Sequence, residues 1–124
     1  MKVFTKVLGG EEKVNFVDEN DVFVGYSMES DCCENFGWFI NAKVSTTVIP
    51  SKTEIPGDLE GWVFDKDYIK KLTPSCVHEG GMVVFRMVKG DEEKFLHLFN
   101  CQNGCYNHGF SFGIGNATKH EGSI

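Results

Sequence analysis

Five cysteines are the residues of this 124-residue chain that point most directly to chemistry. They lie in three places: an adjacent pair in Asp31-Cys32-Cys33-Glu34, a single Cys76, and a pair in Cys101-Gln102-Asn103-Gly104-Cys105. Thiols grouped in this way bind metals, form redox couples or pack as small apolar side chains. An odd number of cysteines leaves at least one of them unpaired within a monomer.

The length of the turn after Cys101 decides which of these roles is open to it. A two-residue turn at Asn103-Gly104, the dipeptide most typical of tight hairpins, directs Cys101 and Cys105 to opposite faces of a ribbon. A three-residue loop sets them directly opposite each other, where a disulfide or a shared metal is feasible. The aromatic pattern favours the two-residue turn, because this turn places four phenylalanines on one face: Phe95, Phe99, Phe110 and Phe112.

The two-residue turn also brings His97, Cys101 and His108 to that aromatic face. Zinc prefers nitrogen and sulfur ligands of this kind, and Cys33, Cys76 or His78 would complete the site. We therefore derive a zinc hypothesis with Cys33, His97, Cys101 and His108 as ligands. The usual Cys-x-x-Cys spacing is missing, so the competing interpretation is a buried cysteine beside hydrogen-bonded histidines.

The adjacent cysteines Cys32 and Cys33 call for a different interpretation. Neighbouring side chains diverge, so the two sulfurs are poorly placed to share one metal, and the flanking carboxylates disfavour the thiolate form. We predict no catalytic residue. We expect a structural loop here, with one of the two thiols buried. Candidate binding residues are Asp31, Cys33 and Glu34 of this loop together with Trp38 and Tyr106 elsewhere in the chain.

The elements that position these residues read as short strands. Residues 13–17 and 22–27 flank a polar four-residue turn, which predicts a hairpin. Apolar or β-branched residues predict further strands over 36–40 and 43–49. Asp65 and Pro74 bound the one stretch with helical spacing, which predicts a short helix over 66–72.

The second half of the chain predicts a meander of three antiparallel strands over 82–89, 94–101 and 106–114. Residues 82–89 are apolar on both faces, which indicates a central strand covered on both sides. Arg86, the only arginine, lies in this strand, and we expect it to be buried against a carboxylate or to lie at the end of the strand. The predicted fold is a single domain over 1–124, mainly β or β-rich α+β. Its antiparallel sheet would curl as a small barrel or sandwich, with the one short helix.

Composition and charge narrow the classes of function. The chain is 41% hydrophobic and 24% charged, as in ordinary globular proteins. Its net charge of −6 repels phosphate backbones and argues against nucleic-acid binding. No apolar stretch has the length of a signal peptide's core or of a membrane span, so we expect a cytoplasmic protein with reduced thiols.

Several motifs together resemble a family of small proteins from bacteria and their phages. The motifs are Phe16-Val-Asp-Glu-Asn20, Phe23-Val-Gly-Tyr26, Asp31-Cys-Cys-Glu34 before Gly37-Trp-Phe-Ile40, Gly57-Asp-Leu59, and Asn103-Gly-Cys105-Tyr106. The family is marked by the Asp-Cys-Cys-Glu element and by a late Asn-Gly-Tyr-Tyr element, from which Cys105 departs. The resemblance implies a fold and a bacterial or phage origin but no established activity. It also implies that Cys33 and the turn at 103–106 lie near each other.

The sequence thus favours a non-enzymatic binding or accessory module whose partner is a protein or a small ligand. Its expected surface is an acidic rim over 18–34 together with exposed aromatic residues such as Trp38 or Trp62. The alternative is a small zinc-binding protein, and a thiol-dependent enzyme is the weaker alternative.

Overall fold

The chain forms two antiparallel β-sheets in a computed structural model that describes residues 1–8, 11–28, 35–47, 59–75, 81–101 and 109–124. Ten strands lie within these residues, with the following bounds: β1 Lys2–Leu8, β2 Glu11–Val17, β3 Val22–Ser27, β4 Asn35–Asn41, β5 Val63–Phe64, β6 Lys70–Leu72, β7 Gly81–Lys89, β8 Glu92–Cys101, β9 Gly109–Ile114 and β10 Ala117–Ser123.

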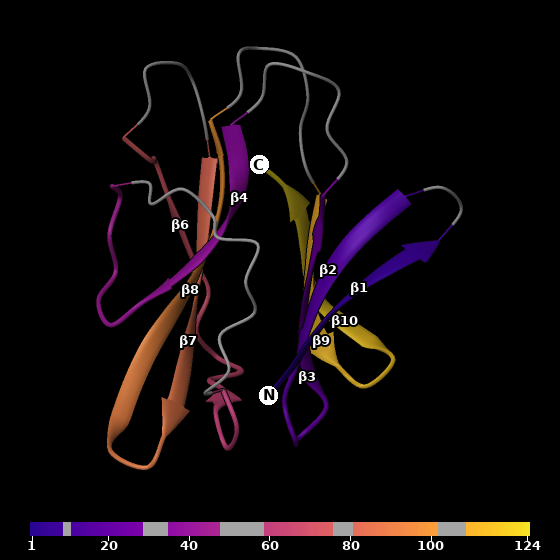
Figure 1. Cartoon of the computed structure of the whole chain (residues 1–124), viewed down its shortest axis with the longest axis vertical. Helices are drawn as coiled ribbons and strands as arrows, with labels where there is room; N and C mark the ends of the chain where they lie inside the picture. Colours follow the sequence, from indigo (N-terminus) through magenta and orange to yellow (C-terminus); the bar gives the residue numbers. More distant parts are fainter. Residues whose placement is uncertain (9–10, 29–34, 48–58, 76–80, 102–108) are drawn as a thin grey trace.

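The two sheets lie side by side as the layers of a sandwich (Figure 1). The first sheet has the strand order β1-β2-β3-β9-β10. The second has the order β4-β8-β7-β5, and β6 also pairs with β7. The predicted β-rich antiparallel fold is therefore confirmed in the form of two open sheets, and the sheets do not close into a barrel.

The predicted hairpin over 13–17 and 22–27 is confirmed as β2 and β3, which pair from Lys13↔Ser27 to Val17↔Phe23. The chain reverses between them at Asp18, whose backbone N–H donates to the carbonyl of Val22. At the end of this turn Asp21 has a φ of 61°, in the left-handed region. Aspartate tolerates that region better than most residues, so the local sequence suits the turn.

The predicted central strand over 82–89 is confirmed as β7, which pairs with β8 along its whole length and with β5 and β6 on its other edge. Gly90 has a φ of 59° at the first position of the two-residue turn between β7 and β8. A positive φ at that position is typical of a type II′ hairpin turn, which glycine adopts without steric cost.

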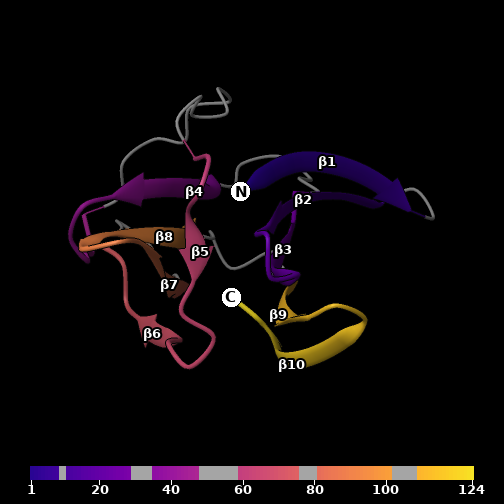
Figure 2. The ribbon, with the colours of Figure 1, turned by 90° about the horizontal axis from the view of Figure 1, so that it is seen from below.

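The main hydrophobic core lies between the two sheets (Figure 2). The first sheet contributes Phe16, Tyr26 and Phe112, and the second contributes Phe85, with further aliphatic residues from both sheets. The hydroxyl of Tyr26 also donates to the backbone carbonyl of Phe99 at 2.8 Å, which ties the two layers together. Burial of this apolar surface is the principal force that holds the sheets against each other.

A second, smaller core covers the outer face of the second sheet. Its buried members are Phe39, Met82, Val84, Phe95, Phe99 and Cys101. Val44 and Tyr68 pack over them from segments outside the sheet, and Leu72 of β6 packs beside them within the sheet. Because the sheet is covered on both sides, β7 is apolar on both faces, as the sequence predicted.

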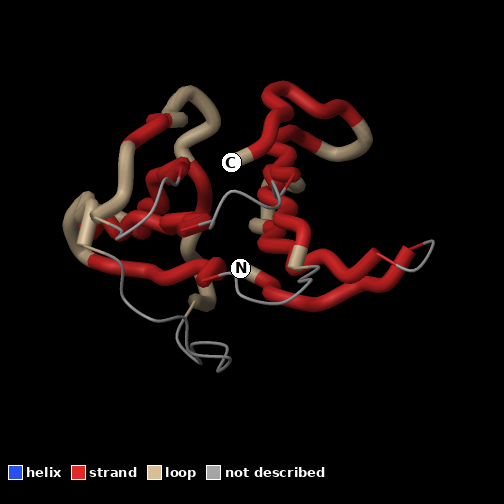
Figure 3. The backbone as a smooth tube through the Cα atoms, turned by 90° about the horizontal axis from the view of Figure 1, so that it is seen from above, coloured by secondary structure: helices blue, strands red, loops and turns tan. Residues whose placement is uncertain are grey.

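The helix predicted over 66–72 is wrong. None of the described residues is helical (Figure 3), and residues 70–72 form β6, which pairs with Met82, Val83 and Val84. The spacing of Tyr68 and Leu72 suits one side of a helix, but the two residues instead lie on the outer face of the sheet. Strand pairing with the long β7 overrides this short local pattern.

The predicted three-stranded meander is correct only for its first hairpin, β7 and β8. The next strand, β9, belongs to the other sheet and pairs with β3 and β10. Phe95 and Phe99 therefore lie on the outer face of one sheet, while Phe110 and Phe112 lie in the core between the sheets. The prediction that all four share one face is wrong, because β8 and β9 are not neighbours.

Two other predicted elements have different outcomes. The strand predicted over 36–40 is confirmed as β4. The strand predicted over 43–49 is not seen in its described part, residues 43–47, where Thr47 forms a single isolated bridge to Ser75. The turn predicted at Asn103-Gly104 lies outside the described residues.

Candidate functional site

His97, one of the four predicted zinc ligands, is fully buried on the outer face of β8 and bonded at both ring nitrogens. Ser45 N–H donates to Nε2 at 3.1 Å, and Nδ1 lies 3.0 Å from the carbonyl of Phe95. Nε2 therefore accepts, and the neutral ring carries its proton on Nδ1. Removal from water lowers the pKa of His97, although the hydrogen bond to Phe95 acts in the opposite direction. Phe39 stacks on the ring at 4.2 Å.

Cys101, the second described member of the zinc hypothesis, is disulfide-bonded. The sequence favoured a free thiol beside aromatic residues and left a disulfide as the alternative. Cys101 is indeed buried beside Phe95 and Phe99, but the favoured free thiol is wrong. A sulfur in a disulfide is not a thiolate ligand, and His97 already uses both ring nitrogens, so neither residue is available to zinc in this arrangement. Cys33 and His108 lie outside the described residues. Among the described residues, no three His, Cys, Asp or Glu side chains gather into a metal-binding group.

The predicted binding residues are only partly described. Asp31, Cys33, Glu34 and Tyr106 lie outside the described residues. Trp38 is 8% exposed and packs edge-on against Phe16 in the main core. Trp62 is buried as well. The expectation that these two indole rings form an exposed aromatic surface is therefore wrong, because both rings fill the space between the sheets.

Asp18, at the start of the expected acidic rim, is a buried structural carboxylate. Its Oδ1 accepts hydrogen bonds from the backbone N–H groups of Asn20 and Val22, both at 2.9 Å. Its Oδ2 accepts from Phe64 N–H at 2.8 Å. The side chain thus closes the turn between β2 and β3 and also holds β5 of the other sheet. Its acceptor oxygens are engaged within the fold.

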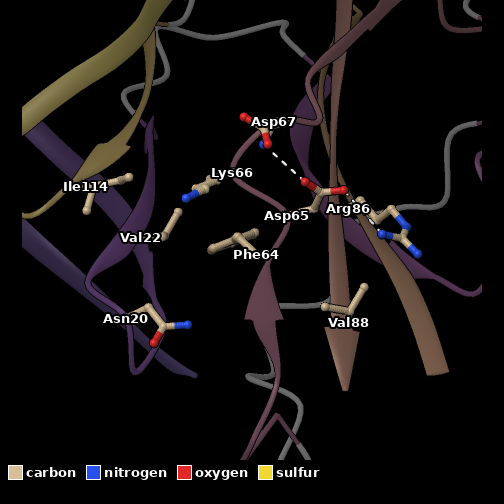
Figure 4. A pocket seen from close by; sticks show the side chains of 9 residues that line it. All are labelled: Asn20, Val22, Phe64, Asp65, Lys66, Asp67, Arg86, Val88 and Ile114. Atoms are coloured by element: carbon tan, nitrogen blue, oxygen red, sulfur yellow. Dashed lines mark hydrogen bonds and ion pairs between the residues drawn. The ribbon is translucent and has the colours of Figure 1, made fainter. Parts of the chain in front are cut away.

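A shallow groove of about 530 Å³ lies beside β5 (Figure 4). Arg86 borders it and bonds two carboxylates, Glu93 at 2.9 Å from Nε and Asp65 at 3.2 Å from Nη1. The predicted contact of Arg86 with a carboxylate is confirmed, although its side chain is half-buried and not fully buried. These two bonds raise the pKa of Arg86, and the bond to Glu93 has the larger effect.

The apolar side chains that line the groove belong to β5 and to strands of both sheets on either side of it. They are Val22, Phe64, Val88 and Ile114, with Asn20, Lys66 and Asp67 at the border of the groove. Lys119 lies 3.5 Å from the carboxylate of Asp67, so this charge is paired too. The main charges around the groove thus balance one another, and the polar side chains of Asn20 and Lys66 border a small apolar hollow.

The free edge of β1 presents backbone groups that are not used by the sheet. The N–H of Met28 bonds the carbonyl of Glu12, which shows that residues 12, 14 and 16 of β2 direct their peptide groups toward β3. Residues 13, 15 and 17 therefore bond β1, at Lys6, Phe4 and Lys2. The N–H and C=O groups of Val3, Thr5 and Val7 consequently point outward, where no other described strand pairs with β1.

The side chains of β1 are also exposed. Phe4 is 42% and Val7 is 65% exposed, and with Ile114 in the groove they are the exposed large apolar residues of the described chain. Val3, Thr5 and Val7 share the face of Phe16, whereas Lys2, Phe4 and Lys6 lie on the outer face. The far half of the β1–β2 hairpin projects past the body of the sandwich (Figures 1 and 2).

The other sheet edges differ from β1. The strand β10, at the opposite edge of the first sheet, is interrupted by a register shift between Thr118 and His120. Bulges of this kind protect an edge against further pairing. In the second sheet, β5 and β6 have two and three residues, and the side chains of β4 from Phe36 to Ile40 are buried or half-buried. Among the described edges, β1 alone is long, regular and exposed.

The sequence analysis missed this candidate site because it did not predict β1. The signal was present, since valine, threonine and valine at 3, 5 and 7 alternate with Lys2, Phe4 and Lys6. The sequence does not reveal, however, which edge of the strand stays unpaired. That depends on its place at the end of the strand order.

No family model matches the sequence, and neither a curated protein nor a solved structure matches it. The geometry above is therefore the basis on which function is inferred. Within the described residues, no helix has the length and apolar character needed to cross a bilayer.

Proposed function

We propose that the chain is a non-enzymatic binding module that takes up an extended segment of a partner protein by strand addition at β1. The observation that carries this proposal is the outward row of N–H and C=O groups at Val3, Thr5 and Val7. Strand addition uses such main-chain groups for affinity and the alternate side chains for specificity. The exposed Phe4 and Val7 supply apolar surface on the two faces of the added strand.

The described polar groups that could carry out chemistry support a binding role over catalysis. Asp18 bonds three backbone N–H groups, His97 is bonded at both ring nitrogens, and Arg86 is held by two carboxylates. Each of them stabilises the fold and is already paired. From the sequence resemblance alone, we also propose a bacterial or phage origin, in which the module acts as an accessory protein.

The test uses three synthetic seven-residue peptides, acetylated and amidated, whose sequence is Thr-Val-X-Thr-Tyr-Val-X with X as Glu, Gln or Lys. When such a peptide pairs antiparallel with residues 2–8, its two X residues lie opposite Lys6 and Lys2, and its tyrosine lies opposite Phe4. In a ¹⁵N-resolved NMR titration, at least one peptide should shift the amide signals of Val3, Thr5 and Val7 in preference to those of β3. If none of the three peptides shifts these signals, the proposal is refuted.

Two proline variants supply a matched control. Thr5→Pro removes an outward N–H and should abolish peptide binding, while the sheet is retained because proline is tolerated on edge strands. Phe4→Pro removes an N–H that bonds β2 and should lower the melting temperature. Peptide binding that persists in a folded Thr5→Pro protein would contradict strand addition.

A further inference from the structure

The charges on the outer face of β1 point to the chemistry of the partner. Lys2 and Lys6 lie on this face, and Lys13 of β2 stands directly opposite Lys6. Among residues 1–8 of the chain there is no carboxylate, although the whole chain carries a net charge of −6. The β1 edge is therefore a local reversal of the protein's overall charge, and it attracts negative groups at short range.

We infer that the β1 edge selects an extended segment with two carboxylate side chains four residues apart, opposite Lys2 and Lys6. This inference rests on the proposed strand addition and adds the partner's charge to it. In an antiparallel pairing, Val3, Thr5 and Val7 form the hydrogen-bonded pairs with the partner. Lys2, Phe4 and Lys6 then occupy the non-hydrogen-bonded positions, where cross-strand side chains lie closest and opposite charges stabilise the pair.

The outer face of β1 also favours a particular kind of partner residue at the position midway between the two carboxylates. Phe4 lies between Lys2 and Lys6 with its ring 42% exposed, so the residue opposite it gains from being apolar or aromatic. On the other face, Val3 and Val7 favour β-branched residues in the partner. The partner segment thus alternates acidic, apolar and acidic side chains on one face with β-branched side chains on the other.

A second copy of the chain fits this edge poorly. An antiparallel pairing of two β1 strands about Thr5 would satisfy the main-chain groups, but it would bring Lys2, Lys6 and Lys13 of each copy to the same outer face. In this register Lys6 of one copy is the diagonal neighbour of Lys2 and Lys6 of the other, and the like charges repel each other at short range. Charge complementarity therefore favours an acidic partner segment over self-association.

The experiment compares the three peptides in which X is Glu, Gln or Lys, using NMR titration of the wild-type chain. We expect the Glu peptide to bind on the order of tenfold more tightly than the Lys peptide, from two cross-strand charge pairs. Raising the NaCl concentration from about 0.05 to about 0.5 M should reduce this difference, because salt screens exposed charges. The double variant Lys2→Glu with Lys6→Glu should reverse the order of the two peptides.

The outcomes separate this inference from the proposed function. Equal binding of the Glu and Lys peptides overturns the acidic preference but leaves strand addition in place, whereas no binding of any peptide overturns both. A shift of the Val3, Thr5 and Val7 amides with protein concentration alone, before any peptide is added, identifies a second copy as the occupant and also overturns the inference. Lys94→Glu, a charge reversal on β8 of the other sheet, is the matched control and should leave the order of the peptides unchanged.

Discussion

The carboxylate of Asp18 gives the sharpest test of how the two sheets are joined. It accepts three backbone hydrogen bonds of 2.8 to 2.9 Å, two within its own turn and one from Phe64 in β5. Asp18→Ala removes all three and leaves the buried N–H groups of Val22 and Phe64 without this acceptor. Asp18→Asn keeps one carbonyl oxygen for Asn20 and Val22 but turns an NH₂ group toward Phe64 N–H.

The magnitudes follow from the number of buried donors that lose their acceptor. Each costs about 1–3 kcal/mol. We therefore expect Asp18→Asn to lower the free energy of unfolding by about 1–3 kcal/mol, and Asp18→Ala by about 2–6 kcal/mol. Asp21→Asn is the matched control in the same turn, since its side chain is exposed and asparagine tolerates the positive φ of 61°. It should change stability by less than about 0.5 kcal/mol.

Urea unfolding followed by circular dichroism measures these free energies, and amide hydrogen exchange locates the effect. In Asp18→Asn, the amide of Phe64 should lose protection more than the amide of Val22. If Asp18→Ala proves too unstable to fold, the asparagine variant still tests whether the hydrogen bond from Phe64 to Asp18 stabilises the protein. The reasoning is refuted if Asp18→Asn is as stable as Asp21→Asn, or if protection at Phe64 does not change.

Three further predictions concern buried groups. Because the pKa of His97 is lowered in the folded protein, the unfolded chain binds the extra proton, so stability should fall as pH drops below about 6.5, at up to about 1.4 kcal/mol per pH unit. Urea unfolding between pH 7.5 and 5.5 should show this slope in the wild type and in His120→Gln, the control variant at an exposed histidine. If the slope persists in His97→Gln, then His97 is not the cause of the pH dependence. Tyr26→Phe leaves the carbonyl of Phe99 without its donor at 2.8 Å and should cost about 1–3 kcal/mol in the same assay, and a cost near zero would mean that this bond does not join the layers. Native mass spectrometry of the oxidised protein should show no zinc held by His97 or Cys101, and a zinc increment that disappears in His97→Gln would restore the zinc hypothesis.

The disulfide at Cys101 disagrees with the expectation that the thiols of this protein are reduced. Cys101 is disulfide-bonded, and disulfides are uncommon in the cytoplasm of most organisms. Alkylation of the denatured protein with and without a reductant would count the free thiols. If all five cysteines react without reductant, the disulfide is absent from the purified protein.

Local patterns in the sequence were sufficient for the two hairpins. Polar residues around Asp18 predicted the turn between β2 and β3, and the break between the predicted strands 82–89 and 94–101 predicted the turn between β7 and β8, because both turns are formed by neighbouring residues. The nearly continuous run of apolar residues in 82–89 likewise predicted a strand covered on both faces. A short stretch such as 66–72 was ambiguous, since a separation of four residues, as between Tyr68 and Leu72, places two side chains on one face of either a helix or a strand.

The sequence by itself determined that this protein is β-rich and antiparallel and that β2–β3 and β7–β8 are hairpins. Only the tertiary structure decided that β9 leaves β8 for the other sheet, that Trp38 and Trp62 are buried, and that one edge of β1 stays unpaired. These outcomes depend on pairing between strands far apart in the chain, and a change of neighbour alters which face of a strand is covered. The candidate site at β1 is of this second kind, because an edge exists only in relation to the whole sheet.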